Sequence, residues 1–185
     1  MNRRMMNLAM PAMMAALIAL CSWICIPAPV PFTLQTLGVF CAAGLLDNRE
    51  SFRAVLVYLL LGVVGLPVFS GFSGGFGHLL GPSGGFLLSF LLVPVICSAF
   101  GKSSKAGILA FSVSLLCCYV CGCLWYAAFY LKSLSLTAIA SAFAQCVLPF
   151  VIPDVLKMIC AVRIIESVKK SPVFRRNCVA IKDLQ

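Results

Sequence analysis

The stretch GLPVFSGFSGGFGHLLGPSGGF, residues 65–86, holds eight of the 14 glycines of the chain and no charged residue. Glycine permits positive φ angles and a close approach of the backbone. Irregular backbone at membrane depth is tolerated only against protein or a cavity. We therefore expect this segment to form a folded lid, with Phe69, Phe72, Phe76 and Phe86 as its apolar surface. The alternative is a flexible loop.

The composition predicts an integral membrane protein. The chain has 185 residues, of which 62% are hydrophobic and 10% charged, with a mean hydropathy of +1.08, whereas about 25% of residues are charged in soluble domains. A spanning helix needs about 20 mostly apolar residues, and the length of the apolar runs argues against an unusually apolar soluble core. Six runs approach spanning length: 5–26, 32–46, 54–69, 83–100, 106–131 and 150–165.

We therefore predict an all-α fold, a bundle of six transmembrane helices. Flanking polar residues or local thinning of the bilayer can complete the shorter spans. Residues 138–148 are apolar but too short to span, and they form either an interfacial helix or a first leg of the last span. The first run could be mistaken for a secretory signal, but its length and the spans that follow favour a transmembrane helix.

The basic residues predict the orientation. If the N-terminus is cytoplasmic and six spans follow, 12 of the 14 basic residues lie on the cytoplasmic side, as the positive-inside rule requires. These are Arg3, Arg4, Arg49, Arg53, Lys102, Lys105, Arg163, Lys169, Lys170, Arg175, Arg176 and Lys182. Both termini are then cytoplasmic, residues 1–168 form the membrane domain, and residues 169–185 form a basic tail along the inner membrane surface. The charges are split among loop ends, which argues against nucleic-acid binding.

The residue inventory argues against catalysis and against bound metal. One histidine and five acidic residues offer neither a nucleophile with its base nor a metal cluster, so we expect no catalytic residue and no cofactor. Four cysteines cluster in CCYVCGC, residues 117–123, inside an apolar run. A C-x-x-C there lacks a second ligand pair, which favours helix packing over a metal or redox site. The odd total of 11 cysteines argues against a disulfide framework.

Three groups of residues, one small, one polar and one charged, are candidates for function. Four alanines share one face of the first helix, where small side chains let another helix approach, either within this protein or from a partner. These are Ala9, Ala12, Ala16 and Ala19. Thr33, Gln35 and Thr36 bring hydrogen-bonding side chains into the membrane, where they either tie helices together or face a ligand.

The third pattern is VLPFVIPDVLKMICAV, residues 147–162. Asp154 and Lys157 are three residues apart and therefore share a helix face. Burying either charge in lipid is costly, so both should face the interior and pair or contact something polar. We expect Pro153 at the first helical position, with Asp154 in the first turn. A purely structural ion pair is the alternative to a binding role.

Three segments in this order resemble the BioY family, over about residues 8–165: VPFTLQTLGVF (30–40), the glycine-rich stretch (65–86) and LPFVIPDVLK (148–157). These proteins are the biotin-specific substrate-binding subunits, or S components, of energy-coupling factor (ECF) transporters. The family usually has a glycine between the proline and the aspartate of its last motif, whereas here Asp154 follows Pro153 directly.

The resemblance implies a protein of the bacterial plasma membrane that binds one biotin near the outer surface, under connecting loops. It also implies docking onto a transmembrane coupling protein and cytoplasmic ATPase subunits, and the alanine face is similar to the coupling surface of the family. A stand-alone carrier for biotin or another vitamin, driven by a gradient such as protons through Asp154 or His78, is the alternative.

The chemistry of biotin fits polar groups within apolar walls. Asp154 can accept hydrogen bonds from ureido N–H groups, Lys157 can neutralise a carboxylate or hold Asp154, and Gln35 can both donate and accept. Which polar group meets which end of biotin stays open. The residues predicted to bind it are Phe32, Thr33, Gln35, Phe72, Ser73, Gly74, Gly75, His78, Trp125, Asp154 and Lys157.

Overall fold

The computed structural model describes residues 3–100 and 104–171, and these are mostly helical. The first half contains α1 (Arg3–Trp23), β1 (Cys25–Ile26), β2 (Phe32–Thr33), α2 (Gln35–Leu45), α3 (Asn48–Val63), the 3₁₀ turn η1 (Ser70–Phe72) and α4 (Phe76–Leu79). The second half contains α5 (Gly84–Ser89), α6 (Leu92–Phe100), α7 (Ser104–Trp125), the π-helical turn η2 (Tyr126–Tyr130), α8 (Leu136–Cys146) and α9 (Leu148–Lys170). The predicted all-α class is confirmed, apart from one two-residue antiparallel pairing of β1 with β2.

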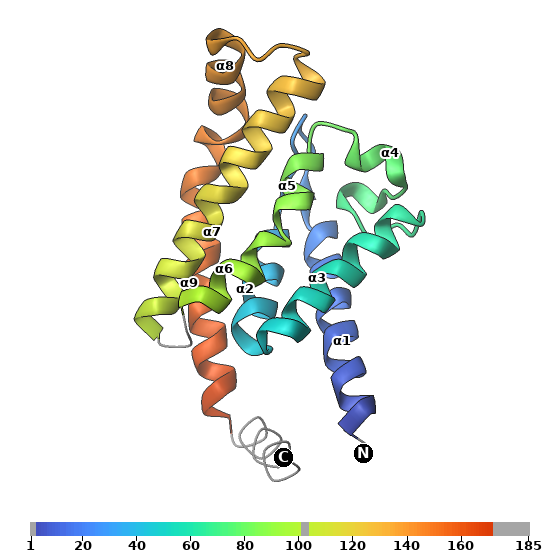
Figure 1. The fold of residues 1–185 in the computed structure, drawn as a ribbon, viewed down its shortest axis with the longest axis vertical. Coiled ribbons are helices and arrows are strands. Elements are labelled where there is room, and N and C mark those ends of the chain that lie inside the picture. The colour runs from blue at the N-terminus through green and yellow to red at the C-terminus, as the bar shows by residue number, and fades with distance from the viewer. Residues whose placement is uncertain (1–2, 101–103, 172–185) are drawn as a thin grey trace.

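The helices form two groups around a central one (Figure 1). α1 packs against α3, and α7 lies along α8 and α9. α2 contacts α1, α3, α6 and α9, which places it between the groups. The start of α1 and the end of α9 lie at the same end of the molecule, while α4 lies toward the other end (Figure 1).

Aromatic rings and small residues close the core between α1, α2 and α3. Tyr58 and Phe69 are fully buried, with their rings edge to face at 5.6 Å between centroids. A Cβ on Gly62 would clash with the ring of Phe69, and one on Gly38 would come within 3.1 Å of the Ile18 Cα. Gly62 therefore lets Phe69 lie directly on α3, and Gly38 lets α1 lie directly on α2.

The helices fall on the predicted apolar runs, but several are shorter than a full span. By length and composition, one continuous helix in the described part of the chain can cross a membrane alone, Gly107–Tyr130 with a mean hydropathy of 2.2. α8 and α9 meet the same criterion only as a pair bent by 45°. α2 has 11 residues, about half of the length that a bilayer core requires. The count of six spans stays a prediction.

The start of α9 differs from the prediction. α9 begins at Leu148, so Pro149 occupies the first turn and Pro153 lies inside the helix. The prediction that Asp154 lies in the first turn is therefore wrong, and it instead lies in the second turn. The reason is the bend at Val147, where α8 ends and α9 starts within the same apolar stretch. Most of the predicted tail, residues 172–185, lies outside the described residues, as does Lys102.

The segment 65–86, which we call the loop segment, is folded as predicted. The Gly75 N–H donates to the Gly62 carbonyl (2.7 Å), and the Phe69 N–H donates to the Ser73 carbonyl (2.9 Å). Gly65, Gly71 and Gly75 have φ of 108°, 68° and 98°, a region that glycine adopts without steric cost. Of its four phenylalanines, Phe69 is buried, Phe86 is partly buried, and Phe72 and Phe76 are exposed.

Candidate ligand-binding pocket

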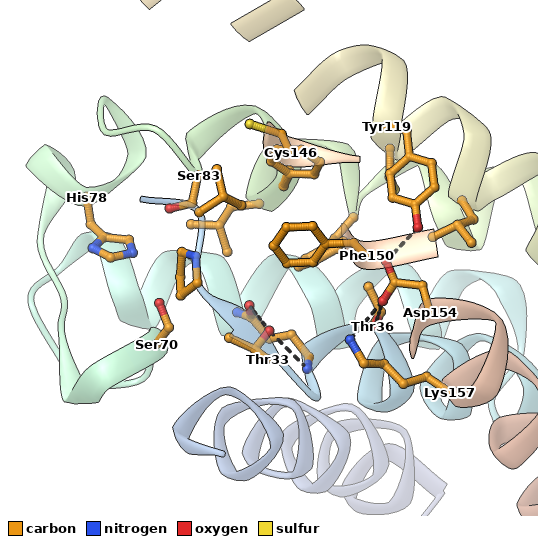
Figure 2. A pocket seen from close by; sticks show the side chains of 18 residues that line it. Thr33, Thr36, Ser70, His78, Ser83, Tyr119, Cys146, Phe150, Asp154 and Lys157 are labelled. Carbon is orange, nitrogen blue, oxygen red and sulfur yellow. Dashed lines mark hydrogen bonds and ion pairs between the residues drawn. The ribbon is translucent and has the colours of Figure 1, made fainter. Parts of the chain in front are cut away.

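A pocket lies between the loop segment and helices α2, α5, α7 and α9. Its lining residues are Val30, Pro31, Thr33, Gln35, Thr36, Ser70, His78, Ser83, Phe86, Leu87, Phe90, Leu115, Cys118, Tyr119, Cys146, Phe150, Asp154 and Lys157. Figure 2 shows polar groups at two ends with apolar side chains such as Phe150 between them. We call the end with Tyr119, Asp154 and Lys157 the helix end, and the end with Ser70, His78 and Ser83 the loop end.

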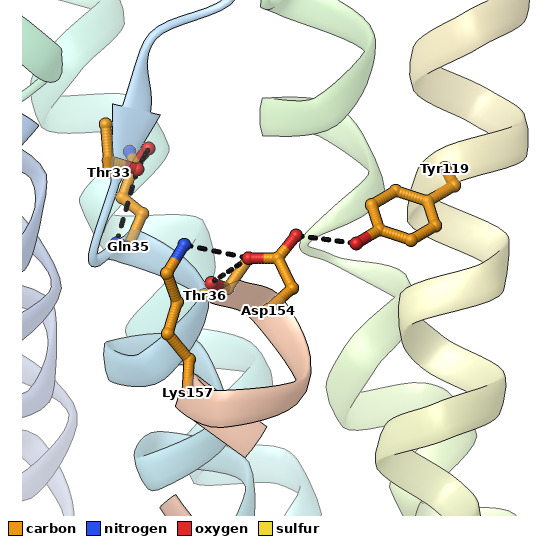
Figure 3. A network of polar contacts seen from close by, with 6 residues as sticks. All are labelled: Thr33, Gln35, Thr36, Tyr119, Asp154 and Lys157. Atoms are coloured by element: carbon orange, nitrogen blue, oxygen red, sulfur yellow. Dashed lines mark hydrogen bonds and ion pairs between the residues drawn. The ribbon is translucent and has the colours of Figure 1, made fainter. Parts of the chain in front are cut away.

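A carboxylate with three donors forms the helix end (Figure 3). Lys157 Nζ lies 2.8 Å from Asp154 Oδ1, which also accepts from Thr36 Oγ1 at 3.3 Å. The Tyr119 hydroxyl donates to Asp154 Oδ2 at 2.7 Å. Asp154 and Lys157 are only 4% and 7% exposed, and a buried ion pair needs such additional hydrogen bonds to offset desolvation. The predicted pairing on one helix face is confirmed.

The ammonium group of Lys157 also contacts an aromatic ring. Lys157 Nζ lies 4.2 Å from the centroid of Phe32, within cation–π range. Phe32 in turn stacks on Phe150 at 5.6 Å between centroids. Phe32, a predicted binding residue, therefore lies directly beside the lysine although it does not line the pocket.

Gln35 ties the middle of the pocket to the core. Its Oε1 accepts from Thr33 Oγ1 at 3.2 Å, and its amide nitrogen donates to the Tyr58 hydroxyl. Thr33 and Gln35 are both buried and both line the pocket. The sequence places them here because β2 turns directly into α2, so the last strand residue and the first helical residue face the same space.

His78 holds a fixed orientation at the loop end. Its Nδ1 lies 3.1 Å from Ser73 Oγ, and its ring stacks on Phe69 at 5.1 Å between centroids. Ser73 Oγ also donates to the Ser70 carbonyl at 2.7 Å. Burial lowers the pKa of the His78 imidazole below its ordinary value, because desolvation disfavours the charged form.

The structure brings five predicted binding residues together around the pocket: Thr33, Gln35, His78, Asp154 and Lys157. The other predicted loop residues build the fold of the loop segment. Ser73 holds His78, Gly75 bonds to α3, and a Cβ on Gly74 would clash with the Leu66 carbonyl.

Like Phe32, two further predicted aromatic residues do not line the pocket. Phe72 is 63% exposed and stacks on Trp23 at 4.8 Å between centroids. The Trp125 indole N–H donates to the Gly81 carbonyl at 3.1 Å, and its ring stacks on Phe129. Trp125 also packs closely against the loop segment, because a Cβ on Gly85 would clash with the Trp125 side chain.

Tyr119, Ser70 and Ser83 line the pocket but were missing from the sequence prediction. Thr36 was singled out from the sequence as a hydrogen-bonding side chain in the membrane, but it was not among the predicted binding residues. Thr36 and Tyr119 hold Asp154, and Ser70 and Ser83 line the loop end. Tyr119 is the tyrosine of CCYVCGC and lies inside an apolar run. Its hydroxyl was the available signal, since a buried hydroxyl needs a hydrogen-bond partner.

Metal-ligating side chains do not gather in the described part of the chain: it contains no group of three or more that could hold a metal ion. Cys118 and Cys146 line the pocket as free thiols. Within the described residues, Cys117, Cys118, Cys121 and Cys123 are all free.

Comparisons with known protein families, known sequences and solved structures all match this chain to the same family. The family model described as "BioY family" matches residues 1–172. The Biotin transporter BioY2 of Lactococcus lactis subsp. cremoris is 40% identical over 163 residues, 85% of this chain and 87% of that protein. The Biotin transporter BioY of Thermotoga maritima is 36% identical over 174 residues, 92% of this chain and 100% of that protein.

A relative from Pyrococcus horikoshii, described as a probable biotin transporter BioY, is 38% identical over 141 residues, 76% of this chain and 82% of that protein. Among solved structures, the S-component for biotin from an ECF-type ABC transporter superposes with a TM-score of 0.79 at 27% sequence identity. The superposition covers 92% of this chain and 95% of that one.

Proposed function

The chain belongs to the BioY family, and from this premise we propose that it binds biotin in the pocket and mediates biotin uptake across the membrane. It does so as the substrate-specific subunit of an ECF-type transporter. The observation that carries the proposal is the buried Asp154–Lys157 pair at one end of a pocket that has apolar side chains such as Phe150 in its middle. Ligand sites combine such apolar walls with a few placed polar groups, and biotin combines an apolar bicycle with a ureido group and a carboxylate.

The arrangement supports binding and transport and assigns no bond-making step to this chain. Asp154 and Lys157 supply an acceptor and a donor, and Gln35 supplies both. Phe86, Phe90 and Phe150 offer apolar walls for the bicycle. ATP hydrolysis is then the task of partner subunits.

We place the loop end toward the outer side of a bacterial plasma membrane, with six spans and both termini in the cytoplasm. The start of α1 and the end of α9 lie together at the end away from α4 (Figure 1), which agrees with this orientation. α1 is the surface for the transmembrane coupling protein. Ala12 and Ala16 are exposed and Ala9 is partly exposed, whereas Ala19 is buried against the protein's own core.

Biotin binding to the purified, detergent-solubilised chain tests the proposal by calorimetry. Native protein should bind tightly, while Asp154→Ala and Lys157→Ala should each lose most of the affinity. Cys160→Ser is the matched control, because Cys160 is an exposed residue of α9 that does not line the pocket. Absence of binding by folded native protein would overturn the biotin assignment, and full affinity in both variants would make the pair purely structural.

Uptake by proteoliposomes separates the two modes of transport. Uptake should require the coupling protein, the ATPase subunits and ATP. Uptake by this chain alone, dissipated by a proton-conducting agent, would instead identify a stand-alone carrier.

A further inference from the structure

We propose that the outer surface of the loop segment lies in the outer leaflet of the bilayer and contacts phospholipid rather than water. The exposed side chains of Leu66, Phe72, Phe76 and Leu80 form this surface, which we call the lipid face. This inference rests on the proposed function, because it needs the loop end of the pocket on the outer side of the membrane.

The sequence of the loop segment lacks the charges of a connection that faces water. No Asp, Glu, Lys or Arg occurs between Arg53 and Lys102, and the four side chains of the lipid face are 45% to 63% exposed. The connection 131–135 at the end of α7 is different, because Lys132 and two serines are exposed there. Large exposed apolar side chains without charges among them indicate contact with another apolar phase.

The short helix α4 has one side toward the pocket and one side away from it. Phe76 and Leu80 are four residues apart, so they lie on the same side, and both are more than half exposed. His78 lies two residues from each and therefore on the opposite side, where it lines the pocket (Figure 2). A single helical turn thus separates the pocket from the lipid face.

The length of α3 places the start of the loop segment at membrane depth. α3 has 16 residues, which correspond to about 24 Å. Arg53 lies in its second turn and is exposed, so it holds the start of α3 at the inner interface. The rest of α3 is too short to cross a hydrocarbon core of about 30 Å. Its end at Val63, two residues before the loop segment, therefore stays within the membrane.

The spanning helix gives the same result from the other side of the molecule. Gly107–Tyr130 has 24 residues, which correspond to about 36 Å and exceed the thickness of the core. The connection between α7 and α8 lies farther from the two termini than α4 does (Figure 1). α4 is therefore level with the membrane-embedded part of this helix or with its outer boundary.

Both tryptophans satisfy carbonyl groups in the backbone of the loop segment. The Trp23 indole N–H donates to the Pro67 carbonyl at 2.8 Å, and that of Trp125 donates to the Gly81 carbonyl at 3.1 Å. Backbone near lipid needs such partners because water is scarce there, and tryptophan is enriched at membrane interfaces. Because the segment is not one continuous helix, we place it at the boundary between headgroups and acyl chains, not at the bilayer centre.

Tryptophan introduced on the lipid face tests the proposal by fluorescence. Phe76→Trp is the probe and Leu134→Trp is the matched control, since Phe76 is 62% exposed and Leu134, in the connection 131–135, is 64% exposed. Neither side chain lines the pocket. Each variant keeps Trp23 and Trp125, and the emission of the added tryptophan is the difference from native protein. The proteins are placed in nanodiscs of phosphatidylcholine with plain or brominated acyl chains.

We expect brominated phosphatidylcholine to remove most of the added emission in Phe76→Trp, because bromine quenches at contact, and iodide in the buffer to leave it unchanged. Leu134→Trp should show the opposite pattern. Leu80→Trp is a second probe on the same side of α4 and should repeat the result of Phe76→Trp. Thermal unfolding shows which variants fold, so one that fails leaves the other to decide.

Two results would overturn the lipid face. Quenching of both probes by iodide but not by bromine would place this surface in water. Protection of both probes from either quencher would mean that protein covers it, such as a second copy of the chain. The measurement uses no ligand, so a native chain that binds no biotin would overturn the proposed function and leave the quenching result standing.

Discussion

Asp154 at the helix end and His78 at the loop end both bring a titratable group to one pocket, but the protein holds them by different means. Asp154 lies on α9 and receives donors from α2, α7 and its own helix, so its position depends on the packing of three helices. His78 is held by a serine and a phenylalanine from nearby in its own segment. The helix end is therefore buried and held by contacts between separate helices. The loop end is partly exposed and held by contacts within one segment of the chain.

The largest effect should come from breaking the charge balance at the helix end. Lys157→Met alone leaves the Asp154 carboxylate buried without its counter-ion, which should lower the free energy of unfolding by about 3–5 kcal/mol. The double variant Asp154→Leu, Lys157→Met removes both charges and should recover most of that loss. Thermal unfolding in detergent measures both. Equal losses in the single and double variants would contradict the pairing as the cause.

The loop end can be tested through two glycines that differ in their surroundings. A Cβ on Gly84 would clash with the Leu79 carbonyl, whereas one on Gly77 meets nothing within 4 Å. Gly84→Ala should lower the free energy of unfolding by about 1–3 kcal/mol because backbone must move. Gly77→Ala, the matched control, should change it by less than about 0.5 kcal/mol. Similar losses in both would mean that the segment depends on glycine flexibility rather than on close packing.

A smaller effect should follow from removing one donor to Asp154. Tyr119→Phe loses the hydrogen bond to Oδ2, while Lys157 and Thr36 still hold Oδ1. Biotin affinity should fall about fivefold, equivalent to about 1 kcal/mol. Calorimetric titration checks this. Tyr130→Phe is the control, since Tyr130 is an exposed tyrosine that does not line the pocket, and an equal loss there would remove the special role of Tyr119.

The smallest effect should come from Phe72, which lies in the loop segment but outside the pocket wall. Phe72→Ala removes an exposed ring and its stack on Trp23. Stability should change by about 0.5 kcal/mol and biotin affinity by less than about twofold. A tenfold loss of affinity would instead show that Phe72 moves onto the ligand when it binds, as the sequence prediction of a binding residue requires.

The same contrast explains what the sequence could predict. Asp154 and Lys157 are three residues apart on one helix, so their spacing and the cost of burying charge were enough to predict the pair. Tyr119 is 35 residues from Asp154 in the chain, and only the packing of α7 against α9 brings them together. For α9, prolines at 149 and 153 both fit a helix start, and the bend after α8 selects the first.

In the loop segment the glycines predicted a folded segment but not the direction that each residue faces. Ser73, Gly74 and Gly75 were predicted to bind ligand, and the structure uses them to hold His78 and to join the segment to α3. Glycine-rich sequence indicates close backbone approach, yet it contains no periodicity from which an inward face could be deduced.

The two tryptophans of the chain have an optical consequence. The indole N–H of Trp23 donates to the Pro67 carbonyl at 2.8 Å, and that of Trp125 donates to the Gly81 carbonyl at 3.1 Å. Both fluorophores therefore hold opposite parts of the loop segment through a hydrogen bond to its backbone. We therefore expect a rearrangement of the loop segment to shift their emission more than a change confined to Asp154 and Lys157 does. The unlabelled protein thus carries its own spectroscopic reporter for one end of the pocket.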